Sequence, residues 1–236
     1  DLLDAAATPP EGSEADLGSS IDGGFLPSHP RALLDAGEFA DVPYLLGANR
    51  DEGTLFFIGT TPITTNAEYQ SELFLRYGGY APAIAAMYPA NLFQTPQDAL
   101  IRVMGDSTIV CSTYDVARRF ADAKGKAFAY AFLRVPPLPF IGLLDLGAFH
   151  GLEIPYVFGS IPPPSTVDEL LGEQMREYWT RFATKGRPKA TQARGWPRFK
   201  SKTWKMLGLD PYLSKLKLYS RAECDFWRGI YEDGGF

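Results

Sequence analysis

The 236-residue sequence has few of the residues that hold metals or carry redox chemistry: two histidines, His29 and His150, and two cysteines, Cys111 and Cys224. The cysteines do not form a C-x-x-C pair, and no metal-ligand spacing occurs, which disfavours a zinc site. Two cysteines are compatible with one disulfide or with two buried thiols, and their spacing does not decide between these alternatives. We therefore expect no metal and no cofactor.

Long apolar runs and an excess of positive charge are also missing. No run approaches the ~18 apolar residues of a membrane span, so we expect no transmembrane segment. The formal net charge is −5, which argues against nucleic acid or an anionic membrane as the main partner. With 45% hydrophobic and 14% aromatic residues, a packed core is expected.

Two apolar runs predict buried strands of a parallel sheet, and each is followed by residues that could carry chemistry. Residues 42–48 form a short apolar run that leads into the charged segment 49–53, which contains Glu52. Open α/β sheets keep their sites at the carboxyl ends of such strands, although a solvated turn is the alternative for these charges. Leu55 and Phe56 follow directly and could be core or the wall of an apolar pocket.

Residues 127–133 predict the second strand, and a loop with three prolines leads from it to His150. A histidine in this position could be a general base or a core or capping residue. An acid that precedes the base along the chain fits the last two places of the α/β-hydrolase order, Ser, then Asp/Glu, then His. Glu153, three residues after His150, could orient a water, support the site through a hydrogen bond or form a structural salt bridge.

The nucleophile of such a relay is missing from this sequence. No G-x-S-x-G occurs; residues 105–109 (GDSTI) come nearest but lack the second glycine that a tight elbow needs. A Gly-rich oxyanion motif is absent too, and neither cysteine lies in an activating motif. Taken alone, the sequence predicts an acid and a base without a nucleophile.

The distal part of the chain predicts further helices and a last strand. The apolar spacing over 166–184 indicates a helix that a capping box of Thr166 and Glu169 would begin, with Trp179 and Phe182 in the core. A helix is predicted after residues 105–108, and the alternation at 204–207 suggests a last strand. We see no linker or repeat, so residues 1–236 are expected to form one α/β unit.

Six segments together resemble the C-terminal part of type-B carboxylesterases and lipases, the family that includes the cholinesterases. They occur in the family's order: residues 21–27 (IDGGFLP), 46–53 (LGANRDEG), 105–111 around Cys111, 149–154 (FHGLEI), 178–183 (YWTRFA) with Trp196-Pro197, and 223–227 (ECDFW). The resemblance implies an incomplete α/β-hydrolase fold, formed by the C-terminal strands of its central, mostly parallel sheet and the flanking helices. It also implies that Glu52 is the acid and His150 the base of a Ser-His-Glu triad.

The same resemblance implies a partner and a location. The serine and the oxyanion loop are expected in an N-terminal part of the same enzyme, on a companion chain. A disulfide between Cys111 and Cys224 is expected, as in the cholinesterase branch, and indicates an oxidising compartment and secretion.

The family resemblance gives a substrate class and one rival function. Leu55 stands where cholinesterases have an aromatic residue, so choline esters are not expected. The pocket walls are expected to be apolar, which favours lipid-like or aromatic esters; they comprise Leu55, Phe56, Phe140, Leu143 and Leu144. The main alternative is a non-catalytic, adhesion-type member of the same fold; a complete, small binding protein is a third.

Overall fold

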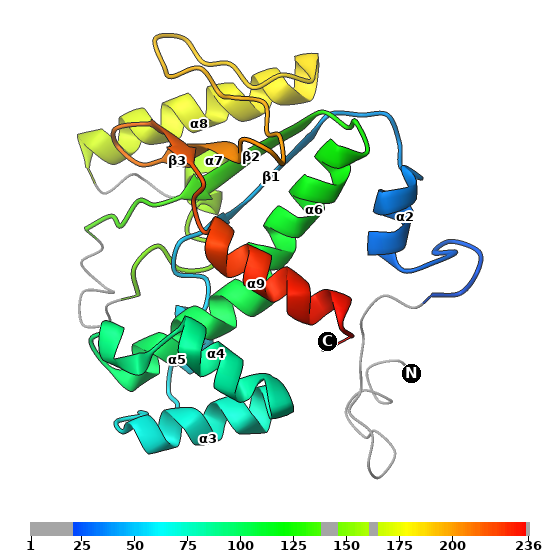
Figure 1. Ribbon diagram of the computed structural model, residues 1–236. Coiled ribbons are helices and arrows are strands. Elements are labelled where there is room, and N and C mark those ends of the chain that lie inside the picture. The colour runs from blue at the N-terminus through cyan, green and yellow to red at the C-terminus, as the bar shows by residue number, and fades with distance from the viewer. Residues whose placement is uncertain (1–20, 138–145, 161–164, 235–236) are drawn as a thin grey trace, which may run out of the picture.

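The computed structural model describes residues 21–137, 146–160 and 165–234, and a four-stranded sheet is the centre of this part (Figure 1). Its strands are β1 (Tyr44–Asn49), β2 (Ala127–Phe132), β3 (Lys205–Leu209) and β4 (Ser214–Lys217), in the order β1-β2-β3-β4. β1 pairs with β2 and β2 with β3 in parallel, whereas β4 is antiparallel to β3. The α/β class and the two strands expected near residues 42–48 and 127–133 are thus confirmed.

The sequence of β2, AFAYAF, explains why this strand lies at the centre of the sheet. All six residues are buried. Because side chains alternate between the two faces of a strand, Ala127, Ala129 and Ala131 pack into one apolar cluster. Phe128, Tyr130 and Phe132 pack into the other. The small face leaves room for helices close to the sheet, and the aromatic face fills the opposite layer.

Helices cover both faces of the sheet (Figure 1). α6 (Cys111–Asp122) and α9 (Arg221–Glu232) lie on the alanine side, where Tyr114 and Trp227 are fully buried. α7 (Ile154–Phe158) and α8 (Thr166–Lys185) belong to the aromatic side. The remaining helices are α2 (Pro30–Ala36), α3 (Asn66–Tyr77), α4 (Ala81–Met87) and α5 (Pro96–Gly105), with 3-10 turns at Thr54–Phe57, Gly78–Tyr80 and Ala90–Leu92.

A disulfide joins the two helices on the alanine side. Cys111 at the start of α6 is bonded to Cys224 in α9, across a sequence separation of 113 residues. Both cysteines are buried, at 0% and 4% exposure. The predicted pairing is therefore present in the structure.

Three details differ from the sequence-based expectation. The helix expected after residues 105–108 begins earlier, because α5 continues through a π-helical turn at Asp106–Val110 directly into α6. α8 is capped by Ser165, which accepts a hydrogen bond from the Asp168 backbone N–H, and not by Thr166 with Glu169. The antiparallel strand β4 was not predicted, because its SKLK sequence is short and polar.

No helix in the described ranges has both the length and the apolar character that a membrane span requires.

Candidate active site

The loop that follows β1 holds Glu52 against the π-helical turn. Gly53 approaches the backbone of α5 so closely that a Cβ there would collide with the Ile101 carbonyl oxygen. Gly105 faces Gly53 in the same way, so two glycines let the acid loop and α5 meet backbone to backbone. As a result Glu52 is buried, with 5% of its side chain exposed.

The loop that carries His150 is fixed to the acid loop by its neighbour Asp51. The Asp51 backbone N–H donates to the Ala148 carbonyl (3.0 Å), and the Ala148 N–H donates back to Asp51 Oδ2 (2.7 Å). Gly147 has φ +59° and lies so close to the Asp51 carboxylate that no side chain would fit there. The two loops, about 100 residues apart in sequence, therefore form a parallel bridge between Asp51 and Phe149 beyond the end of β1.

Glu52 and His150, the predicted acid and base, share a hydrogen bond. The distance between Glu52 Oε2 and His150 Nδ1 is 2.7 Å, and 55% of the histidine side chain is exposed. The other carboxylate oxygen, Oε1, accepts a bond of 2.6 Å from the Asn49 backbone N–H. Burial raises the pKa of Glu52 above its ordinary value, and the bonds from Asn49 and His150 offset part of this rise.

Asn49, at the end of β1, links both loops and was not predicted from the sequence as a site residue. Its side-chain Nδ2 donates to the Phe149 carbonyl (2.7 Å) and to Glu153 Oε2 (2.6 Å). Only 1% of Asn49 is exposed. Its position as the last residue of a buried strand was the one available signal. Glu153 thus accepts a hydrogen bond from Asn49 and not from the imidazole.

A hollow of about 330 Å³ lies beside Glu52, between the acid loop and α5. Its lining is part polar and part apolar, and six charged residues contribute: Arg50, Asp51, Glu52, Asp98, Arg102 and Asp106. Asp106 Oδ2 accepts hydrogen bonds from Arg102 Nε (2.8 Å) and from the Tyr88 hydroxyl (2.9 Å). Asp106 Oδ1 and Asn49 Oδ1 are buried and find no hydrogen-bond partner among the described residues.

Of the five residues predicted to bind substrate, the structure describes Leu55 and Phe56. Leu55 and Phe56 belong to the 3-10 turn Thr54–Phe57; Leu55 is half-buried and Phe56 is 49% exposed. Neither lines the hollow beside Glu52. Phe140, Leu143 and Leu144 lie outside the described residues. Within the described ranges, no three His, Cys, Asp or Glu side chains are grouped to hold a metal ion.

This geometry suits proton transfer by the imidazole. The Nδ1 atom is occupied by the carboxylate of Glu52, which fixes the tautomer and would stabilise an imidazolium, and Nε2 is left for a reacting group. An acid and a histidine that follow neighbouring parallel strands in this chain order match the last two positions of an α/β-hydrolase triad. Of such a triad, the described residues contain the acid and the histidine.

Comparison with known proteins identifies the family. A model of the carboxylesterase family matches residues 2–227. The chain is 33% identical to a cholinesterase of Mus musculus over 237 residues, which cover 90% of the chain and 39% of that protein. It is 31% identical to a fumonisin B1 esterase of Sphingopyxis macrogoltabida over 78% of the chain and 35% of that protein. It is 27% identical to an acetylcholinesterase of Bungarus fasciatus over 88% of the chain and 38% of that protein.

The chain therefore belongs to the carboxylesterase family, and the predicted resemblance is confirmed. It spans less than two fifths of the length of these relatives.

Proposed function

We propose that this chain supplies the acid and the base of a serine carboxylic-ester hydrolase. The observation that carries the proposal is the 2.7 Å contact between the buried Glu52 carboxylate and the half-exposed His150 imidazole. The esterases among the relatives support the same reaction class. Glu52 is the acid that orients the imidazole, and His150 is the general base.

The reaction proceeds in two steps. His150 Nε2 takes the proton of a serine hydroxyl as its oxygen attacks the ester carbonyl, and then gives this proton to the departing alcohol. The resulting acyl-serine is cleaved by a water molecule whose proton His150 accepts and then returns to the serine. Glu52 stays ionised throughout and stabilises the imidazolium. No metal or organic cofactor takes part.

The serine and the oxyanion donors come from an N-terminal part of the same enzyme. Two observations support such a partner. β1 pairs with β2 on one side only within the described residues, so its other edge is free to add a strand. The polar hollow beside Glu52 also contains Asp106, whose Oδ1 atom has no described partner and would accept a hydrogen bond from the added segment.

The substrate is an apolar or lipid-like ester, and the enzyme works outside the cell. The half-exposed Phe56 next to Leu55 favours an apolar acyl or alcohol group. The Cys111–Cys224 disulfide favours a secreted protein, because such bonds persist in oxidising compartments.

The two histidines of the chain provide the test and its control. In the intact protein, His150→Asn should lower kcat/KM for p-nitrophenyl butyrate by about 10⁴-fold or more, as loss of a triad base does. His29→Asn should leave the activity within about twofold, because His29 only caps α2, where asparagine is an equally good cap. If His150→Asn retains wild-type turnover, the assignment is wrong and the non-catalytic, adhesion-type alternative is favoured.

A further inference from the structure

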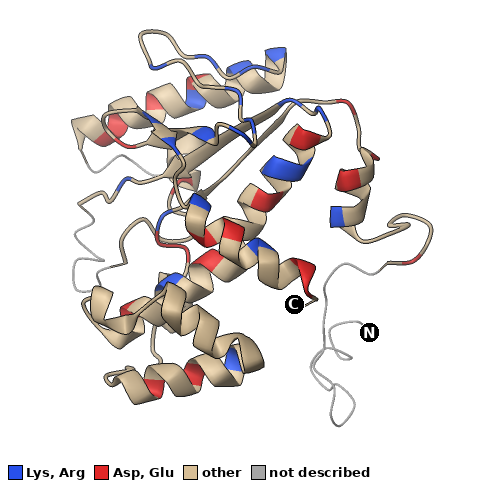
Figure 2. Ribbon diagram, in the orientation of Figure 1, with Lys and Arg blue, Asp and Glu red and all other residues tan. Residues whose placement is uncertain are grey.

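The lysines of this acidic chain are confined to two segments. All nine occur at positions 124 and 126 or between 185 and 217. Residues 185–217 contain ten Lys and Arg side chains against a single acid, Asp210. Residues 185–217 therefore have a net charge of +9, and because the whole chain has a net charge of −5, the other residues together have a net charge of −14. Figure 2 shows the corresponding blue segments on the loop after α8 and on the strands next to it.

The cations of this basic surface are exposed, and none of them forms an ion pair with an acid among the described residues. The basic surface comprises Lys124, Lys126, Lys185, Arg187, Lys189, Arg194, Arg198, Lys200, Lys202, Lys205, Lys215 and Lys217, all of them exposed. By contrast, arginines elsewhere are paired, for example Arg102 with Asp106 and Arg134 with Asp168. The basic surface therefore keeps its charge available for an external anion.

Two neighbouring acids are each paired with an arginine outside the basic surface, so they offset its charge only in part. Asp122 forms an ion pair with Arg118 and accepts from the Ser201 hydroxyl. Glu177 forms an ion pair with Arg181 and accepts from the backbone N–H and the hydroxyl of Thr191, with Lys189 nearby. In the β3–β4 pair, Lys205 stands directly opposite Lys217, an arrangement of like charges that is unfavourable unless an anion lies between them.

Part of the basic surface surrounds a hollow of about 320 Å³. Four cations line it, Lys124, Arg198, Lys200 and Lys202, together with Ser201. Arg198 is held in place because its Nη2 donates to the Gly125 carbonyl (3.1 Å). A hollow of this size with several cations at its edge suits an anionic group such as a sulfate or a carboxylate.

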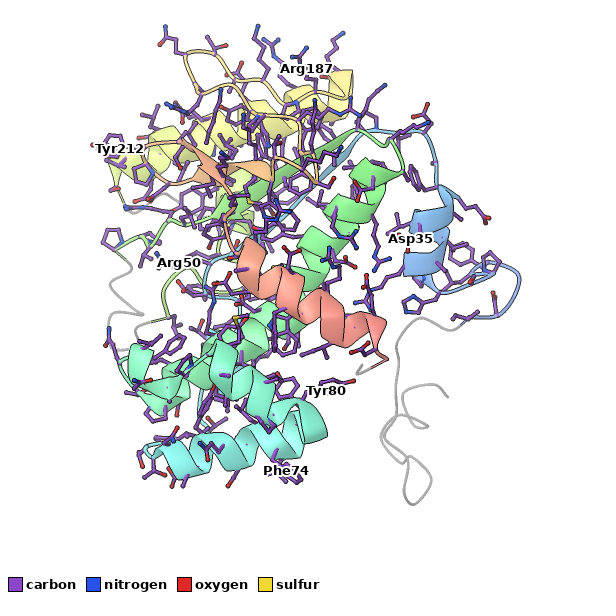
Figure 3. All side chains as sticks on the ribbon, viewed as in Figure 1. Asp35, Arg50, Phe74, Tyr80, Arg187 and Tyr212 are labelled. Atoms are coloured by element: carbon purple, nitrogen blue, oxygen red, sulfur yellow. A yellow bond between two sulfur atoms is a disulfide. The ribbon has the colours of Figure 1, made fainter. Side chains whose placement is uncertain are left out.

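The hollow lies at the opposite end of the sheet from Glu52 and His150. The Phe199 N–H donates to the carbonyl of Ala127, the first residue of β2, whereas the site follows the carboxyl ends of β1 and β2. Six residues of β2 separate the two ends, roughly 17 Å at the usual rise per residue. Figure 3 likewise separates Arg187 of the basic surface from Arg50 of the acid loop. A ligand on the basic surface would thus leave His150 and Glu52 accessible.

We propose that the basic surface binds an anionic polysaccharide that carries sulfate or carboxylate groups. Among the large apolar side chains of 185–217, only Tyr212 is exposed by more than half, so little is available to enter a bilayer or to stack on bases. Recognition therefore depends on regularly spaced charge. β2 separates the free edge of β1 from β3 and β4, so a strand added to that edge lies away from Lys205, Lys215 and Lys217.

Heparin, a sulfated polysaccharide, serves as the probe. The intact protein is titrated into a fluorescein-labelled heparin oligosaccharide at 0.1 M salt, and the anisotropy gives Kd. Lys200→Gln with Lys202→Gln should raise Kd by about tenfold, the sum of two exposed charge contacts. The charge-matched control is Arg76→Gln with Arg228→Gln, in α3 and α9, and should change Kd by less than about twofold.

The other measurements distinguish the alternatives. Hydrolysis of p-nitrophenyl butyrate should be the same in both double variants and in the presence of heparin, since the two regions are apart. The affinity should fall steeply with salt concentration. Equal weakening by both variant pairs would mean that net charge alone is sensed and would overturn the proposal. Absence of heparin binding would do the same, and so would stronger binding to phosphatidylserine vesicles or single-stranded RNA than to heparin.

Discussion

At the scale of single residues, two adjacent acids have different tasks. The Asp51 carboxylate binds the Ala148 N–H and the Arg50 guanidinium (2.8 Å), so it holds the histidine loop in register. The Glu52 carboxylate binds the imidazole itself. The structure thus supports Glu52, and not its neighbour, as the acid of the relay.

Exchanging each acid for its amide separates these tasks. In the intact protein, Glu52→Gln should lower kcat for p-nitrophenyl butyrate by about 10⁴-fold, because the amide favours the wrong tautomer and does not stabilise the imidazolium. Asp51→Asn should have a much smaller effect on kcat and should mainly lower the melting temperature. A larger loss of kcat in Asp51→Asn would show that the acid had been assigned to the wrong residue.

The pH dependence of stability provides the folding control for Glu52→Gln. Burial raises the pKa of Glu52, so the folded state binds this proton more tightly than the unfolded state does. Ionisation of Glu52 therefore costs stability above its folded-state pKa, and this cost vanishes below its ordinary value of 4.5. At neutral pH the inactive Glu52→Gln variant should melt at the wild-type temperature or above it, and this advantage should disappear in acid.

Sequence patterns could indicate the site residues that follow a recognisable apolar segment, but not those whose contacts are made only in the folded chain. Glu52 and His150 became candidates because each follows a segment with a readable apolar pattern, and the family resemblance supplied the roles expected of them. Asn49 could not be predicted, because its two side-chain bonds reach Phe149 and Glu153, about 100 positions away. Such contacts depend on how the histidine loop packs against the end of β1, which no local pattern specifies.

At the scale of secondary-structure elements, the start of α8 is organised around the buried Asp168. Its carboxylate accepts bonds from Arg134 Nε (2.7 Å) and from the Tyr156 hydroxyl (2.7 Å), and Ser165 donates to it as well. The helix was predicted from its apolar spacing, but its cap was placed one residue too late. Ser165 and Thr166 are both hydroxyl residues, so only the tertiary contacts of Asp168 decide between them.

Asp168→Asn tests this arrangement. Burial alone would raise the pKa of Asp168, but the bonds from Arg134, Ser165 and Tyr156 outweigh burial and lower it. Its carboxylate therefore contributes stability that is present above the ordinary value of 3.8 and is lost as the pH falls through the lower folded-state pKa.

At pH 7 we expect a loss of about 2–3 kcal/mol for Asp168→Asn in urea unfolding. This loss should shrink towards pH 3. Ser165→Ala, which removes only the cap, should cost about 1 kcal/mol. A loss of stability in Asp168→Asn that does not depend on pH would contradict the electrostatic explanation.

At the scale of the whole molecule, the sheet order and the disulfide connect distant parts of the chain. The α/β class was predictable because apolar runs alternate with helical periods. The edge strand β4 was not, because Lys215 and Lys217 alternate with only one large apolar residue, Leu216. The local excess of lysine was also hidden by the net charge of −5.

The disulfide should contribute substantially to stability. It closes a loop with a sequence separation of 113 residues, so it restricts the unfolded chain strongly. Replacing both Cys111 and Cys224 with alanine should lower the free energy of unfolding of the intact protein by about 3–5 kcal/mol. Dithiothreitol should lower the melting temperature of the wild type and leave that of the double variant unchanged. Equal sensitivity of both proteins to the reductant would contradict this role.

The π-helical turn between α5 and α6 also constrains how this sequence can change in length. A π turn accommodates one residue more than an α-helix would, and one residue corresponds to about 100° of rotation. Deleting a single residue from within this turn would therefore convert it into ordinary α-helix and leave Asp106 beside Tyr88 and Cys111 beside its partner sulfur in nearly unchanged phase. A one-residue deletion in the regular helix on either side would instead rotate the two ends of the continuous rod against each other by about 100°, so a change in length is tolerated at the π turn and not next to it.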